Sequence, residues 1–265
     1  MRLLLAIPAW AAYLGATVTL AMNLMGRVRV NKALPLAMAF LGLCLHGIVA
    51  YHFLFPAGGV DLHFFNALSL TAWLITLLWG LMAITQPLES LGIAILPVAA
   101  LSLALQMSLG ESHTSLRTGN LGVDLHILLS MLAYSVLSIA ALQAILLAIQ
   151  EKHLREKHPG GFIRALPPLQ VMEKLLFRLI AIGFVLLTFA LIAGALYVEN
   201  LFAQHLVHKT VLSIIAWCVF AVLLWGRWRF GWRGRTAIRW TLGGFFFLML
   251  AYFGSKWVLE IALHR

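Results

Sequence analysis

Histidine is the residue type in this chain whose placement best suits cofactor chemistry. Neutral imidazole nitrogens bind iron, and two imidazoles from facing helices suit the axial positions of a haem. Among the ten histidines, the candidate iron ligands are His46, inside an apolar segment, and His126 and His208, at the mouths of two others. The pattern predicts a b-type haem.

His46 lies within the apolar run LGLCLHGIVAYHF, about nine residues before the outer end of the predicted helix 33–55 and therefore roughly 14 Å deep at 1.5 Å per residue. An ionisable side chain at that depth is costly and needs a partner, which makes His46 a candidate ligand within the membrane. The alternative is a neutral imidazole that hydrogen-bonds to a neighbouring helix.

His126 and His208 each open a predicted helix, where a side chain can reach the interior while its backbone stays near water. The four-residue spacing in HILLSMLAY predicts that Ser130 and Tyr134 share the face of His126. Haem propionates need cations, and those expected on this side are Lys209, Arg117 and Lys256.

A zinc site would use the same histidines, but zinc more often recruits Cys or carboxylate at short spacing. Asp124, two residues before His126, could orient that imidazole or cap the helix, and we favour the cap. Cys44 and Cys218 lie inside apolar runs without metal-ligand spacing, so we expect small core residues rather than a disulfide.

The elements that position these side chains follow from composition. The 265 residues are 62% hydrophobic and 11% charged, whereas a soluble domain carries about 25% charged residues. Apolar runs recur along the chain, and about 20 helical residues cross a membrane. We therefore predict an all-α, polytopic integral-membrane bundle, a single domain over residues 1–265. Its eight helices are expected at 3–25, 33–55, 65–84, 91–109, 125–150, 175–197, 208–226 and 238–261.

The first apolar run resembles a signal peptide, but it continues to about Met25 and the stronger basic cluster follows it. This order favours a retained first helix.

Basic residues concentrate in alternate connections. The first, fifth and seventh connections with their flanks hold 14 of the 19 Lys and Arg residues, including the stretch WGRWRFGWRGR at 225–235. Under the positive-inside rule these connections are cytoplasmic, which places both termini on the outer, periplasmic side of a bacterial inner membrane. Eight of the ten histidines then fall on the outer side: His46, His52, His63, His113, His126, His205, His208 and His264.

This topology explains the net charge of +10, so the lipid bilayer is the expected partner and nucleic acid is not. The chain has no G-x-S-x-G, Walker, zincin or CxxC motif. We therefore predict no catalytic residues, and an enzyme is not favoured.

Four segments carry a family resemblance: HILLSMLAYSVLSIAALQAILL from His126, HKTVLSIIAWCVFAVLLWG from His208, then GWRGR and AYFGS. Together they resemble the cytochrome c assembly protein family, membrane proteins that handle haem, and in length its short YpjD- and HemX-like branch. The resemblance is best over the second half of the chain. It implies an outer-side haem site with axial histidines at helix mouths. By position, His126 corresponds to the family's first outer histidine, and His208 lies near the start of the penultimate helix.

One departure concerns the Trp-rich W-G-x-x-W-x-W-D motif, which haem-ligating family members carry just before that penultimate helix. The corresponding loop here is ENLFAQHLVHK and contains no tryptophan. The resemblance therefore does not extend to direct attachment of haem to apocytochrome c.

Three functions stay open. The favoured one is a haem-binding membrane protein that assists haem handling or cytochrome c assembly, with other assembly proteins as partners. A b-type cytochrome that passes electrons to quinone would need histidine pairs on the inner side, where only His153 and His158 lie, both in a charged loop. The third is a cofactor-free regulator or scaffold.

Overall fold

The computed structural model describes residues 2–55, 61, 63–110, 120–156, 161–197 and 207–254. Its regular elements are all helical, and the described residues contain no strand. The long helices are α1 (Arg2–Leu24), α2 (Ala33–Leu54), α3 (Phe64–Thr85), α4 (Gly92–Leu109), α5 (Leu121–Arg155), α6 (Leu169–Tyr197), α7 (Val207–Phe230) and α8 (Gly234–Met249). Short turns of helix are η1 (Glu89–Leu91), η2 (Gly161–Ala165) and the π-helical η3 (Leu250–Gly254), which continues α8.

Eight helical segments among the described residues are long and apolar enough to cross a membrane. The predicted all-α, polytopic membrane fold is confirmed. The largest extensions beyond the predicted ranges are in α5, α6 and α7: α5 starts four residues earlier and ends five later, α6 begins at Leu169, and α7 runs to Phe230. The added turns carry Lys, Arg and Glu, because a helix continues into the headgroup region after its apolar part has ended.

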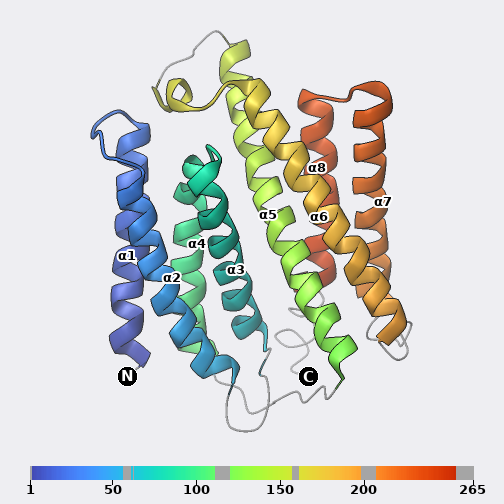
Figure 1. The fold of residues 1–265 in the computed structure, drawn as a ribbon, viewed down its shortest axis with the longest axis horizontal. Helices are drawn as coiled ribbons and strands as arrows, with labels where there is room; N and C mark the ends of the chain where they lie inside the picture. Colours follow the sequence, from blue (N-terminus) through green and yellow to red (C-terminus); the bar gives the residue numbers. More distant parts are fainter. Residues whose placement is uncertain are drawn as a thin grey trace. The chain divides into compact units, whose positions relative to one another are not determined.

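The chain divides into two compact units, and Figure 1 shows the four long helices of each as antiparallel neighbours. Unit 1 comprises Met1–Arg117 and Lys157–Pro167, and so contains α1 to α4. Unit 2 comprises Thr118–Glu156 and Pro168–Arg265, and so contains α5 to α8. This division into compact units does not test the prediction of a single domain over residues 1–265, which remains a prediction.

In unit 1, α1 packs along α2 and α4. The ring of Tyr13 lies over Gly42 of α2, where a Cβ atom would come within 2.7 Å of it. Small residues let membrane helices approach closely in this way. Because Ala9, Tyr13 and Ala16 are fully buried, α1 is part of the bundle of unit 1.

In unit 2, α5 and α6 form the longest interface and α8 packs on α5 and α7. The side chain of Leu137 fills the space over Gly183, where a Cβ would lie 2.6 Å from it. A second close approach of α5 and α6 is at Gly194, next to the ring of His126.

Cys44 and Cys218 are free, as expected, but both are exposed, so their assignment as core residues is wrong. A membrane helix can turn apolar side chains to lipid, and hydrophobicity therefore does not predict burial here.

Candidate functional site at the start of α5 and α7

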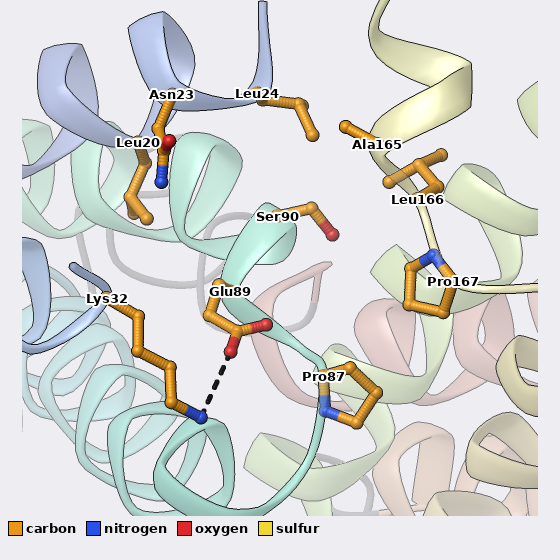
Figure 2. Close-up of a pocket in the computed structure, with 10 residues that line it drawn as sticks. All are labelled: Leu20, Asn23, Leu24, Lys32, Pro87, Glu89, Ser90, Ala165, Leu166 and Pro167. Atoms are coloured by element: carbon orange, nitrogen blue, oxygen red, sulfur yellow. Dashed lines mark ion pairs between the residues drawn. The ribbon is translucent and has the colours of Figure 1, made fainter. Parts of the chain in front are cut away.

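One pocket of unit 1, of about 330 Å³, is lined by no candidate histidine (Figure 2). Its charged residues are Lys32 and Glu89, whose Nζ and Oε1 atoms lie 3.4 Å apart. Figure 2 shows this pair beside the α3–α4 connection, with Leu166 and Pro167 across the pocket. This pocket therefore does not mark the candidate site, which is described below from the positions of the histidines.

His126 lies in the second turn of α5, half-buried against α6. Its Nδ1 atom is 2.7 Å from the carbonyl oxygen of Ala190. Gly194, one turn further along α6, makes the room: a Cβ there would lie 2.9 Å from Cε1 and 3.0 Å from Nδ1 of the imidazole. The ring therefore occupies a notch formed by two small residues of α6.

This hydrogen bond determines the state of the imidazole. A carbonyl oxygen only accepts, so Nδ1 must carry the proton that it donates. In the neutral ring, Nε2 then holds the lone pair. Metal-binding histidines are commonly fixed in this way, with one ring N–H on a backbone carbonyl and the other nitrogen on the metal.

His208 is the second residue of α7 and its side chain is exposed. The register of α6 against α7 follows from a hydrogen bond of 2.9 Å from Trp217 Nε1 to Thr188 Oγ1. His208 is nine residues before Trp217 in α7, and Tyr197 is nine residues after Thr188 in α6. Because the two helices are antiparallel, His208 is level with Tyr197, roughly one to two turns beyond the His126 notch. Lys209, half-buried, follows directly. The starts of α5 and α7 lie at the same end of unit 2 (Figure 1), and His126 and His208 belong to the first turns of these helices.

Tyr134 lies further down α5, buried in an aromatic cluster. Its ring centroid is 5.6 Å from Phe245, 5.7 Å from Tyr252 and 5.4 Å from Phe253. These neighbours belong to α8 and η3, whereas His126 faces α6. Over the eight residues from His126 to Tyr134, a helix turns by about 80° beyond two full turns. The two side chains therefore point in different directions instead of sharing one face.

His46 is fully buried in unit 1, and both of its ring nitrogens have partners. Nδ1 is 3.2 Å from the Tyr13 hydroxyl, and Nε2 is 2.8 Å from Ser69 Oγ. The contacts continue from Ser69 Oγ to Gln106 Oε1 (2.7 Å), and from Gln106 Nε2 to Asn66 Oδ1 (3.1 Å). This His46 chain crosses α1, α2, α3 and α4.

The direction of the His46 chain follows from its donors. Ser69 has one hydroxyl proton and donates it to Gln106, so His46 Nε2 must donate to Ser69. In the neutral ring Nδ1 then accepts from Tyr13. This arrangement matches the alternative for His46, a neutral imidazole hydrogen-bonded between helices, and leaves it no nitrogen for iron.

Helix α5 is capped by Asn120, whose side chain accepts from the backbone N–H of Gly122 at 2.9 Å. The expectation that Asp124 is the cap is wrong, because the helix starts four residues earlier than its apolar pattern indicates. The N–H of Asp124 is itself bonded to the Asn120 carbonyl.

Several predicted participants lie outside the described residues: Arg117, Lys256, His113, His205 and His264. Within the described part of the chain, no three His, Cys, Asp or Glu residues group as they would around a metal ion.

Sequence reasoning missed Ala190 and Gly194, because small residues in an apolar helix carry no signal of what packs on them. It also missed the partners of His46. Their signal was available, since Asn66, Ser69 and Gln106 are polar residues inside apolar runs, and such residues seek one another.

These features define a polytopic helical membrane protein with histidines at the mouths of two helices of one unit. The chain belongs to the cytochrome c assembly protein family, whose sequence model matches residues 34–263. The match begins in α2, so it extends well beyond the second half of the chain.

Two relatives illustrate the range of the family. Inner membrane protein YpjD of Escherichia coli K12 is 34% identical over 262 residues, which cover 96% of this chain and 98% of that protein. Cytochrome c biogenesis protein CcsA of Prochlorococcus marinus is 25% identical over 232 residues, 76% of this chain and 73% of that protein. No solved structure matches the chain significantly. Fold and family together confirm a multi-pass inner-membrane protein.

Proposed function

We propose that this protein binds a b-type haem at the end of unit 2 where α5 and α7 start, and assists haem handling or cytochrome c assembly. His126 and His208 are the axial ligands in this proposal. It assigns no bond-forming catalysis to the chain, because the Trp-rich motif of haem-ligating members is missing from the loop before α7.

The observation that carries the proposal is the anchored imidazole of His126. Its Nδ1–H is fixed on the Ala190 carbonyl, and Nε2 keeps the lone pair that an iron ligand needs. Haem iron needs only one or two axial ligands from the protein, and not a cluster of three or more metal-binding side chains. Two histidines on separate helices of one bundle can supply these axial ligands.

The remaining residues act on position and charge. Lys209 follows His208 and could pair with a propionate, as could Arg117, which lies outside the described residues. Tyr134 and its aromatic neighbours on α8 and η3 form an apolar cluster further down α5. Both ring nitrogens of His46 are used in the His46 chain, so the proposal gives this residue no contact with the haem.

The basic connections at the other end of the helices favour a periplasmic location for this site. A haem bound there would lie on the periplasmic side of the membrane. Haem-handling or cytochrome assembly proteins are accordingly the partners that we propose.

The test is an optical spectrum of the full-length, detergent-purified protein after haemin addition. We expect a reducible Soret and α-band signal that is lost in His126→Ala and in His208→Ala. Protein that stays colourless with added haemin would sink the proposal. Two haems with separate potentials would instead favour the b-type cytochrome.

His153→Ala is the matched control. His153 lies at the other end of α5, and its Nδ1 also contacts a backbone carbonyl, that of Ile149 at 2.9 Å. It is half-buried, as His126 is, and has the same ring chemistry. We expect the spectrum of this variant to equal that of the parent protein.

A further inference from the structure

Two arginines, Arg233 in the connection between α7 and α8 and Arg235 at the start of α8, reach two different carboxylates. Arg233 Nε lies 4.0 Å from Glu173 of α6, and Arg235 Nε lies 3.3 Å from Glu151 of α5. Gly234 between them has φ +50°, in the left-handed region that glycine adopts without strain. The two arginines are therefore held at two defined places.

Glu173 already has a strong partner in Arg227. The Arg227 Nη1 atom donates to Glu173 Oε1 at 2.7 Å and to the Trp232 carbonyl at 3.0 Å. Its guanidinium also lies 4.6 Å from the centre of the Phe177 ring. Since Arg227 is fixed on three sides and neutralises Glu173, the other cations nearby are in excess.

A pocket of about 190 Å³ surrounds Glu173, and Gln170, Lys174, Arg227 and Arg233 complete its lining. Three cations and one carboxylate leave it with two excess positive charges. Among the described residues Lys174 forms no ion pair, and the Arg233 side chain is 73% exposed. The pocket of Figure 2 differs, because its Lys32 and Glu89 cancel each other.

An exposed apolar stripe of α6 continues from this pocket. Lys174 and Arg178 are exposed one turn apart, and the same face of the helix then carries Ile182, Val185, Phe189 and Ile192, which are 46%, 51%, 55% and 50% exposed. A free anion would bind the cations alone and would gain nothing from contact with an adjacent apolar surface. A phospholipid needs both, with its headgroup at the cations and its acyl chains along the stripe.

We propose that the Glu173 pocket binds the phosphate headgroup of an anionic phospholipid through Lys174 and Arg233, with its acyl chains on the exposed stripe of α6. Basic pockets between membrane helices suit such headgroups. Arg227 and Glu173 hold the pocket open, while Lys174 and Arg233 contact the phosphate.

The test uses the full-length protein, delipidated in neutral detergent, with bound lipid counted by native mass spectrometry. Titration with phosphatidylglycerol should give saturable binding, and phosphatidylcholine should not. The double variant Lys174→Gln/Arg233→Gln should weaken phosphatidylglycerol binding about twenty-five-fold, because each cation at an anionic headgroup contributes a factor of about five. Circular dichroism establishes that the variant stays helical.

The control Arg27→Gln/Arg29→Gln removes two exposed cations from the α1–α2 connection, and neither lines the Glu173 pocket or the pocket of Figure 2. It should bind phosphatidylglycerol as the parent does. An equal loss in both variants would show general surface attraction and overturn the proposal. Competition by millimolar inorganic phosphate at the same stoichiometry would overturn it as well, because the site would then take a free anion.

Discussion

His46 and His126 are the same residue type in two contrasting regions of the molecule. The His46 chain of unit 1 uses both ring nitrogens inside a fully buried network that joins four helices. The notch in unit 2 uses one nitrogen of a half-buried ring at a helix mouth. A histidine deep in a membrane is thus no better a ligand candidate than one at its edge, because its partners decide the role.

The two regions also differ in how the helices make room. In the notch, Gly194 removes a side chain so that a ring fits between α5 and α6. In the His46 chain, polar side chains from each helix meet and satisfy one another. The first arrangement positions one group, and the second ties the bundle together.

The sharpest test of this contrast is His126→Ala. We expect haem affinity to fall by more than about a hundredfold, since removal of even a supporting partner of a metal ligand costs 10–100-fold. The free energy of unfolding of the haem-free protein should change little. Haemin titration and thermal unfolding measure the two effects, and a large loss of stability with unchanged affinity would reverse the assigned roles.

Gly194→Ala should have the next largest effect, although it leaves His126 in place. The added Cβ would lie 2.9 Å from the ring, so the imidazole must leave the Ala190 carbonyl. We expect a 10–100-fold loss of haem affinity. Gly243→Ala is the matched control, because a Cβ at Gly243 meets nothing within 4 Å. Equal haem affinities in the two variants would contradict the notch.

His46→Ala should produce the opposite pattern to His126→Ala. It leaves the buried Tyr13 hydroxyl without its acceptor and opens a cavity beside Ser69. An unsatisfied buried group costs about 1–3 kcal/mol, so we expect a loss of about 2 kcal/mol in the free energy of unfolding. Haem binding per folded molecule should stay unchanged in the same spectroscopic assay.

The sequence predicts the eight spans well, because length and hydropathy of a span are set by the bilayer. It predicts helix ends poorly at Leu169 and Phe230, where polar residues continue a helix beyond the apolar part. It locates His126 and His208 at helix mouths, yet it does not indicate that Ala190 anchors one of them. That contact joins residues 64 positions apart, and nothing local to either residue encodes it.

The smallest and most discriminating change is Tyr13→Phe. The ring stays over Gly42, and only the hydroxyl that donates to His46 Nδ1 is lost. We expect a loss of about 1 kcal/mol in the free energy of unfolding, less than for His46→Ala, because a single acceptor is left unsatisfied. The variant also gives His46 a free lone pair. If His46 were a hidden ligand, Tyr13→Phe in the His126→Ala background would restore haem binding. We expect no recovery, because the freed nitrogen lies inside a fully packed bundle.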